Sequence, residues 1–420
     1  MSLAPARKGW CPSLLSPMPS GDGWLVRVKP TAATVSASAA RLIADAARRH
    51  GNGHIDLTSR ANFQLRGLTP ESAERVADSV IGAGLARPDP SIERVRNVMA
   101  SPLGPNDPSA AFDAHALARD LEAMLGAEPA LQALPAKFGF LVDGGELLPL
   151  QGVTADIMVR AHRHRLAVQL EGGTRAALCS PAMLAETVRA LALAFLHLSW
   201  ERREPPRRMR ALLMMTGEEA IFEAAGLTAV AAPPLASSPP SPIGFVPYSP
   251  QDMGAFGAGL PFGRIEAGAL TALAALSETF GDGTLRTTPW RALLIPCVAA
   301  DHSPALAAAI GALGLITGAA DRRLALFACV GAPACTSASV DARADANRIA
   351  AESLAPGISI HVSGCAKGCA HSSPAALTLV GRDGRYDMVR DGSAGDTPTL
   401  TGLDIEQIIG ALAGEPGAAA

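Results

Sequence analysis

Two pairs of cysteines near the C-terminal end of the sequence have the residue type and the spacing to bind a metal centre. Cys329 and Cys335 lie in FACVGAPACTS, and Cys365 and Cys369 lie in SGCAKGCAH. The sequence has only 7 cysteines in 420 residues, so their concentration here points to metal or redox chemistry. The remaining three cysteines are isolated in the sequence, and we expect them to be small buried hydrophobic residues. They are Cys11, Cys179 and Cys297.

Three interpretations of the four cysteines stay open on the residues alone. They could be inert core residues, but both pairs lie among glycines, a proline and small polar residues, as loops do. Structural zinc sites prefer about two to four residues within a pair, and the first pair is wider. A 4Fe–4S cluster suits wider, irregular spacing, and nearby glycines would let backbone N–H groups approach its sulfides: Gly331, Gly364 and Gly368. The residues favour the cluster over zinc.

The composition indicates a globular protein with more than one domain. Hydrophobic residues make up 48% and charged residues 18% of the sequence, and the net charge is −3 at pH 7. These values exclude a disordered chain and a basic footprint for nucleic acid. No signal peptide is evident, and no uninterrupted apolar run reaches the roughly 18 residues of a membrane helix. We therefore expect a cytoplasmic protein that binds neither nucleic acid nor membranes.

Two halves of the sequence resemble each other at an offset of 230 residues. GNGHIDLTSRANFQL (51–65) aligns with GDGTLRTTPWRALLI (281–295), and upstream WLVRV (24–28) aligns with PFGRI (261–265) after a seven-residue change in offset. Each repeat is expected to contain a strand, an alanine-rich helix, a Gly-x-Gly turn and a second strand. The Pro-rich stretch 231–250 is expected to link the halves.

The segments outside the repeats alternate between helical and strand patterns, which predicts an α+β or α/β organisation. Helices are expected at 36–50, 115–126, 181–198, 266–280 and 341–353. Strands are expected at 138–142, 153–159, 165–170, 324–328, 358–362 and 376–380.

The cysteine spacing resembles that of the nitrite and sulfite reductase superfamily, in which four cysteines hold a 4Fe–4S cluster and the last also bridges to siroheme iron. The resemblance covers roughly residues 9–412. It implies an α+β fold with a duplicated architecture of ferredoxin-like units and sulfite-reductase-type α/β domains related by a pseudo-twofold axis. The implied divisions are a first ferredoxin-like unit (1–105), a first α/β domain (106–230), a Pro-rich linker (231–250), a second ferredoxin-like unit (251–318), a cluster-binding α/β domain (319–412) and a flexible tail (413–420).

Four further motifs resemble the ligand-binding segments of this superfamily, in the same order: WLVRVKP, IDLTSRANFQLRGL, RVRNV and LPAKFGF. The resemblance implies that their polar side chains bind a tetrapyrrole through charge-assisted hydrogen bonds to its carboxylates. These residues are Arg27, Arg60, Asn62, Gln64, Arg96, Asn97 and Lys137. Arg27, Arg96 and Lys137 would be catalytic. Positions 60, 62 and 64 alternate, so we expect them on one face of a strand.

One departure from the sulfite reductases matters for the chemistry. They have a Lys-x-Lys motif where this sequence has Lys137-Phe138-Gly139, so one cation that would hold an oxyanion is missing. SGCAKGCAH and GWCPSLLSPMPSGDGWLVRVKP resemble instead the branch of the superfamily that acts in cobalamin biosynthesis. That resemblance implies an oxidoreductase: a monooxygenase that uses dioxygen to hydroxylate precorrin-3A at the meso carbon between rings A and D, with γ-lactone formation.

The same resemblance implies a 4Fe–4S cluster and a mononuclear non-haem iron. His371 would be a ligand of that iron or a hydrogen-bonding neighbour of the cluster. No Gly-x-Gly-x-x-Gly follows an expected strand, so we expect electrons from a reductase or ferredoxin partner. Two alternatives stay open: a siroheme-dependent ferredoxin-type sulfite or nitrite reductase, and a non-enzymatic binding protein held by a four-cysteine zinc site.

Overall fold

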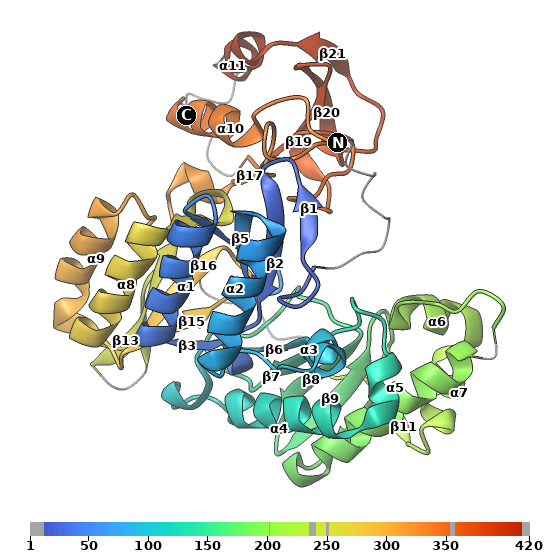
Figure 1. The fold of residues 1–420 in the computed structure, drawn as a ribbon. Helices are drawn as coiled ribbons and strands as arrows, with labels where there is room; N and C mark the ends of the chain where they lie inside the picture. The colour runs from blue at the N-terminus through green and yellow to red at the C-terminus, as the bar shows by residue number, and fades with distance from the viewer. Residues whose placement is uncertain (1–11, 201, 235–240, 249–251, 353–357, 414–420) are drawn as a thin grey trace.

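The computed structural model describes residues 12–200, 202–234, 241–248, 252–352 and 358–413. Figure 1 shows a central part with helices α1, α2, α8 and α9, a lower part with α4 to α7, and a C-terminal part at the top. The described strands form four sheets, and the expected α+β fold is confirmed. Cys11 and residues 414–420 of the expected tail lie outside the described residues.

The first five-stranded sheet comes mainly from the N-terminal half. Its order is β1 (Met18–Ser20), β2 (Gly23–Val28), β5 (Phe63–Leu68), β4 (His54–Leu57) and β14 (Arg264–Glu266), with all neighbours antiparallel. Helices α1 (Ala37–His50) and α2 (Pro70–Gly82) pack on it. The Ser36 side chain caps α1 by accepting a hydrogen bond from the Ala39 N–H, and Thr69 with Ser72 forms a capping box at α2.

The second five-stranded sheet repeats this plan with the C-terminal half. Its order is β12 (Gly244–Tyr248), β13 (Met253–Gly259), β16 (Ala292–Ala299), β15 (Thr284–Thr287) and β3 (Thr34–Ser36). Helices α8 (Ala267–Phe280) and α9 (Ser303–Ala312) follow β14 and β16 in the chain.

Each of these two sheets receives its last strand from the other half of the chain. Strand β14 pairs with β4 of the first half, and β3 pairs with β15 of the second. Helices α1 and α8 pack against each other, and a single hydrophobic core contains residues of both halves, such as Ile43, Leu65, Leu270 and Ile295. The two halves therefore bury their apolar faces together, as one unit.

The structure corrects the alignment upstream of the two helices. The 3-10 turns Thr31–Ala33 and Pro261–Gly263 are equivalent, and each holds a residue with positive φ, Ala32 at 50° and Phe262 at 52°. The offset of 230 therefore continues unchanged through β2 and β13, and WLVRV corresponds to residues 254–258 rather than to PFGRI. The seven-residue change in offset is therefore wrong. It arises because β2 and β13 share few residue types, so the sequence offers little basis for aligning them.

The structure also corrects part of the expected linker. Gly244–Tyr248 within 231–250 form β12, which pairs with β13 along its whole length. Pro247 can lie there because β12 is the edge strand of its sheet, where one side of the backbone needs no ladder partner. Residues 235–240 and 249–250 of this stretch lie outside the described residues.

A six-stranded sheet forms the lower part. Its order is β11 (Ala229–Ala231), β10 (Arg175–Cys179), β9 (Arg165–Leu170), β8 (Ile157–His162), β7 (Phe140–Asp143) and β6 (Val98–Ala100), with β6, β7 and β8 parallel. Its helices are α3 (Pro90–Val95), α4 (Ala114–Ala127), α5 (Leu184–Trp200), α6 (Met209–Thr216) and α7 (Glu218–Ala224). The segment Pro181–Trp200 is long and apolar enough to cross a membrane, but Val188, Leu191 and Phe195 of α5 pack in the core of this sheet, as in a core helix of a soluble domain.

The C-terminal sheet carries the cysteines. Its order is β17 (Leu326–Ala328), β18 (Ile360–Ser363), β19 (Ala375–Arg382), β20 (Arg385–Gly392) and β21 (Leu400–Leu403), with α10 (Ala342–Ala351) and α11 (Ile405–Ala413). The first three strands are parallel. The carboxyl ends of β17 and β18 therefore meet at one edge of the sheet. Cys329 directly follows β17, and Cys365 lies two residues after the end of β18.

The expected elements have counterparts in the structure. The helices correspond to α1, α4, α5, α8 and α10, and the strands to β7, β8, β9, β17, β18 and β19. The largest boundary difference is at 153–159, where β8 begins only at Ile157.

A buried ion cluster fastens the C-terminal part to the first sheet. The Asp56 carboxylate on β4 accepts from the Arg264 guanidinium at 2.9 Å and lies 3.0 Å from that of Arg343 on α10. Burial alone would raise the pKa of Asp56, but the positive charges of Arg343 and Arg264 outweigh it, and the pKa is lowered. One carboxylate therefore joins the first half, the second half and the C-terminal part.

We predict that Asp56→Asn lowers the free energy of unfolding by about 3 kcal/mol, because it leaves the partly buried guanidinium groups of Arg264 and Arg343 without their shared carboxylate. Because the folded pKa of Asp56 lies below the ordinary 3.8, its stabilisation is complete above about pH 4 and is lost as the pH falls further. Urea unfolding at pH 7 measures the loss. Asp45→Asn, which removes exposed ion pairs on α1, is the control and should cost much less; equal costs would contradict the prediction.

Candidate active site

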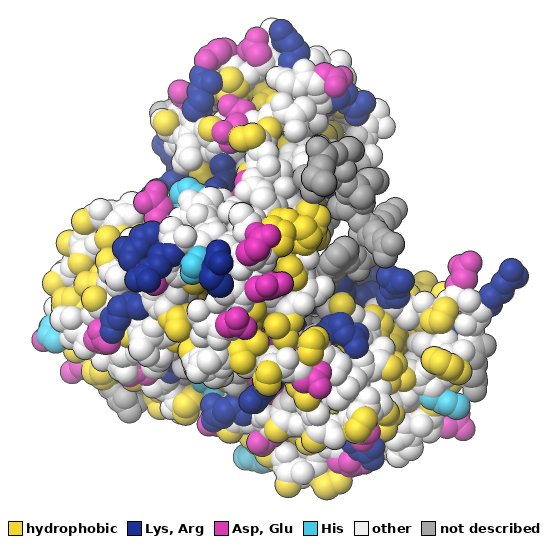
Figure 2. Space-filling model, viewed as in Figure 1, with side chains coloured by type: hydrophobic (Ala, Val, Ile, Leu, Met, Phe, Trp, Pro, Cys, Tyr) yellow, Lys and Arg dark blue, Asp and Glu magenta, His cyan; other side chains and the backbone are white. Residues whose placement is uncertain are grey.

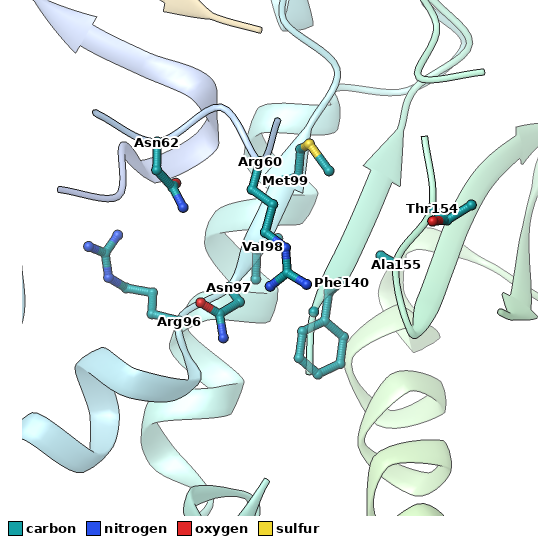
Figure 3. A pocket seen from close by; sticks show the side chains of 10 residues that line it. Arg60, Asn62, Arg96, Asn97, Val98, Met99, Phe140, Thr154 and Ala155 are labelled. Carbon is teal, nitrogen blue, oxygen red and sulfur yellow. The ribbon is translucent and has the colours of Figure 1, made fainter. Parts of the chain in front are cut away.

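Two adjoining cavities lie where the first sheet meets the six-stranded sheet. One has an empty volume of about 380 Å³ and the other about 630 Å³, and both are lined by Arg60, Asn62 and Asn97. Figure 3 shows the first, with Arg60 extending between Asn97 and Phe140. Figure 2 shows a notch between the C-terminal and lower parts of the molecule, with Lys and Arg side chains along its lower edge. The shared lining makes the two cavities one elongated site.

Arg60 and Asn62 reach the cavity from a turn rather than from a strand face. The turn is closed by the Thr58 N–H donating to the Asn62 carbonyl at 2.9 Å and the Ala61 N–H to the Thr58 carbonyl at 2.9 Å. Ala61 has φ 56°, and β5 begins only at Phe63. The expected alternation of positions 60, 62 and 64 on one strand is therefore wrong, although two of the three residues line the site.

Arg27 and Gln64 lie on the paired strands β2 and β5. The Arg27 Nε donates to Gln64 Oε1 at 3.1 Å, and Gln64 is only 9% exposed. Arg27 lines the larger cavity, whereas Gln64 lines neither of the two. In the structure Gln64 therefore supports Arg27 from behind.

Arg96 is buried beside the smaller cavity. Its side chain is 3% exposed, and all three guanidinium nitrogens donate within the protein: to Glu93, to Thr31 and Glu122, and to the Leu85 carbonyl. Figure 3 shows it pointing away from Arg60. Its donors are thus used within the protein, while Arg96 also belongs to the lining of the smaller cavity. The expected contact of Arg96 with a substrate stays a prediction.

Asn97 and Arg60 both donate to backbone carbonyls of the segment around Lys137. The Asn97 Nδ2 donates to the carbonyls of Arg94, Ala136 and Phe138, so its side chain fixes the segment before β7. The Lys137 carbonyl accepts from the Arg60 Nη2 at 3.0 Å. The Lys137 residue is exposed and does not belong to the lining of either cavity. The structure thus places it beside the site without bringing it into the site.

Gly139 faces the smaller cavity, at the position of the absent lysine. A Cβ there would lie 3.5 Å from the Asn97 carbonyl oxygen and 3.9 Å from the Arg60 Nη1, so a side chain would fit. The Gly139 N–H donates to the buried Asp156 carboxylate at 2.9 Å, which also accepts from the Met209 N–H at the start of α6. The backbone at this position is therefore fixed, and the space beside Arg60 is open.

Sequence reasoning missed several residues of the larger cavity: Pro12, Ser13, Ser16, Lys29 and Arg94. Lys29 lies two positions after Arg27, and Arg94 two before Arg96, so the same motifs contained the signal. The Lys29 Nζ donates to the Glu93 carbonyl at 2.7 Å, and the Arg94 guanidinium donates to the carbonyl of Leu134. Their charges still raise the positive potential of the cavity.

The four cysteines gather in two loops at the carboxyl edge of the C-terminal sheet. Burial and the negative charges of the other three raise the pKa of the Cys369 thiol, and the Gly364 N–H donates to the Cys329 Sγ at 3.1 Å. Within the described residues, no group of three or more His, Cys, Asp or Glu side chains is close enough to hold a single metal ion. The thiols are close enough for their charges to act on one another, and the choice between a 4Fe–4S cluster and zinc stays a prediction.

The first cysteine loop is docked on the first sheet. The Ala334 carbonyl, just before Cys335, accepts from the Gly21 N–H, the Ser20 hydroxyl and the Arg66 Nη2 at 2.8–3.1 Å. The Arg66 guanidinium is also held by Asp22 at 2.9 Å. Strands β1, β2 and β5 therefore position this loop at the sheet that also carries Arg27.

His371 lies beside the cysteine loops, two residues after Cys369. Its ring stacks on Phe327, with centroids 4.0 Å apart, and meets the ring of His361 edge-on at 5.9 Å. Burial lowers the pKa of His371. Its expected role as an iron ligand stays a prediction.

We predict that Arg96→Gln destabilises the protein by about 3–5 kcal/mol, because it leaves Glu93 and Glu122 buried without their partner. Arg60→Gln is the matched variant from the cavity lining. It should retain the unfolding midpoint and lose about tenfold or more in affinity for a polycarboxylate tetrapyrrole, since one charge-assisted hydrogen bond contributes roughly 1.5–3 kcal/mol. Urea unfolding and fluorescence titration separate the two effects, and a stable Arg96→Gln protein that binds tenfold more weakly would reverse the assignment.

The chain has relatives across one superfamily. The family model described as the nitrite/sulfite reductase ferredoxin-like half domain matches residues 16–81 and 250–313. These two segments contain the helices and most strands of the two five-stranded sheets. A precorrin-3B synthase of Sinorhizobium sp is 32% identical over 413 residues, covering 95% of this chain and 86% of the relative. A ferredoxin–nitrite reductase of Synechococcus elongatus is 24% identical, covering 87% of this chain and 77% of the relative.

A solved structure has the same fold. The NirA protein of Mycobacterium tuberculosis superimposes with a TM-score of 0.72 at 20% identity, over 91% of this chain and 77% of that one. This confirms the expected duplicated architecture. Together with the relative that is 32% identical along nearly the whole sequence, it establishes that the chain belongs to the precorrin-3B synthase family of the nitrite/sulfite reductase superfamily.

Proposed function

We propose that the chain is a precorrin-3B synthase: a monooxygenase that hydroxylates precorrin-3A at the meso carbon between rings A and D, with γ-lactone formation, in cobalamin biosynthesis. The observation that carries the proposal is the 32% identity to a precorrin-3B synthase over 95% of the chain. The nitrite reductase relatives are more distant, at 24% for the one from Synechococcus elongatus.

The charge of the site suits a substrate with many carboxylates. The described lining of the two cavities includes basic side chains and no Asp or Glu. Arg27 and Arg60 are the two that we assign to the substrate's carboxylates, because guanidinium groups bind carboxylates through paired hydrogen bonds. Gln64 would orient Arg27, and Asn97 would hold the wall that Arg60 contacts. Arg96 would act only by fixing the turn that carries Asn97.

The missing lysine favours a neutral co-substrate over an oxyanion. A reductase must stabilise a charged oxyanion with several cations, and position 139 offers no side chain beside Arg60. Dioxygen needs no such cation. The open space at Gly139 supports placing the reacting carbon and dioxygen there.

The residues present suit the expected cofactor. Cys329, Cys335, Cys365 and Cys369 would hold a 4Fe–4S cluster, which supplies electrons one at a time when bound. The expected mononuclear iron has no three-residue ligand group among the described residues, so we assign it no ligands. An external ferredoxin or reductase would deliver the electrons, and we place the protein in the cytoplasm with no nucleic-acid or membrane partner.

We predict that changing any one of the four cysteines to Ser abolishes the brown colour and lowers iron and acid-labile sulfide, because cluster binding requires all four thiolates. Ser at Cys179 or Cys297, which lie elsewhere, should leave iron and sulfide unchanged. Four single variants that kept full iron and sulfide would refute the cluster assignment.

The decisive test of function uses isotopically labelled dioxygen. The protein is purified anaerobically, incubated with precorrin-3A and a reductant, and then exposed to labelled dioxygen. We expect a product that carries one labelled oxygen atom, as measured by mass spectrometry. An unlabelled product, together with rapid turnover of sulfite or nitrite and the absorption bands of siroheme, would replace the proposal with the reductase.

A further inference from the structure

Arg291 places a partly buried positive charge close to the cysteine loops. It lies in the turn before β16, at the position that Ala61 occupies in the first repeat, and the two residues have φ values of 57° and 56°. The second repeat thus keeps the unusual backbone of the turn and replaces a methyl group with a guanidinium.

Among the described residues, the guanidinium donates to two backbone carbonyls. Its Nη1 donates to the Leu326 carbonyl at 2.5 Å and its Nη2 to the Leu324 carbonyl at 2.6 Å. No carboxylate of the described residues forms an ion pair with it. Burial lowers the pKa of Arg291 to about 10, so it stays charged at pH 7. The residue is partly buried and lines a cavity together with Trp290 and Leu324, so its charge is left to be balanced by solvent or by a bound group.

A stack of rings connects this charge to both cysteine loops. The guanidinium carbon lies 4.5 Å from the centroid of the Phe327 ring, and the same ring stacks on His371. Phe327 precedes Cys329 by two residues, and His371 follows Cys369 by two. The positive charge is therefore fixed beside the place where four thiolates would hold a cluster.

We propose that Arg291 is a positioning residue that supplies the positive charge opposing the cluster, and that it makes the cluster easier to reduce. The inference rests on the proposed function. In the step concerned, one electron passes from an external one-electron reductant to the cluster, and no bond of the protein forms or breaks. The cluster becomes more negative by one charge, and a nearby cation in a medium of low dielectric constant stabilises that reduced form.

The test compares Arg291→Gln, which removes the charge and keeps amide donors, with Arg291→Lys, which keeps the charge and loses the planar fork. Phe327→Leu loses the ring and keeps the charge. Each protein is purified anaerobically, its iron and sulfide are measured, and the cluster is titrated with redox mediators and followed by electron paramagnetic resonance. At the midpoint potential of the unchanged protein, Arg291→Gln should show an about tenfold lower ratio of reduced to oxidised cluster. This ratio corresponds to a midpoint potential that is lower by ~59 mV for one electron.

Arg291→Lys and Phe327→Leu should stay much nearer the unchanged midpoint. An Arg291→Gln protein with full iron and an unchanged midpoint would overturn the proposal, and so would an equal shift in the Gln and Lys variants. Should the Gln variant not fold, the other two still decide, because a tenfold change in either contradicts a role for charge. An unchanged protein without iron and sulfide would instead refute the proposed function, which separates the two failures.

Discussion

The exchange of β3 and β14 between the two halves is the constraint on which the rest of the structure depends. Because each short strand completes the other half's sheet and α1 packs on α8, the two sheets are fixed relative to each other. The turn with Arg60 opens from the first sheet onto the six-stranded part, and the turn with Arg291 opens from the second onto the C-terminal part. The substrate cavity and the cysteine loops are thereby placed by one shared core.

The two repeats bury opposite charges at one equivalent position. Asp56 on β4 and Arg286 on β15 are equivalent at the offset of 230, and both are almost fully buried. Asp56 binds arginines of the second half and of the C-terminal part. Arg286 instead donates to Asn106 beside the six-stranded sheet at 2.8 Å. Opposite charges at one position thus attach a different part of the molecule to each repeat.

The sequence predicted most of this architecture, and it failed where a residue's role depends on distant partners. Four cysteines in glycine-rich loops and a group of basic motifs are local features, so they could be read directly. The acidic surroundings of Arg96 could not be predicted, because one of its two acidic partners, Glu122, comes from helix α4 far along the chain. The turn at Arg60 was mistaken for a strand because alanine at position 61 gives no sign of a positive φ.

The strand exchange also has a consequence for synthesis of the chain on the ribosome. Strand β4 ends at Leu57, and the strand that covers its free edge begins at Arg264, roughly two hundred residues later. At about 5–20 residues per second, that edge waits on the order of 10–40 s for its partner. During this time it is an open template for neighbouring nascent chains. Chaperones in excess, which cover such an edge while the rest of the chain is made, therefore suit production of the folded protein.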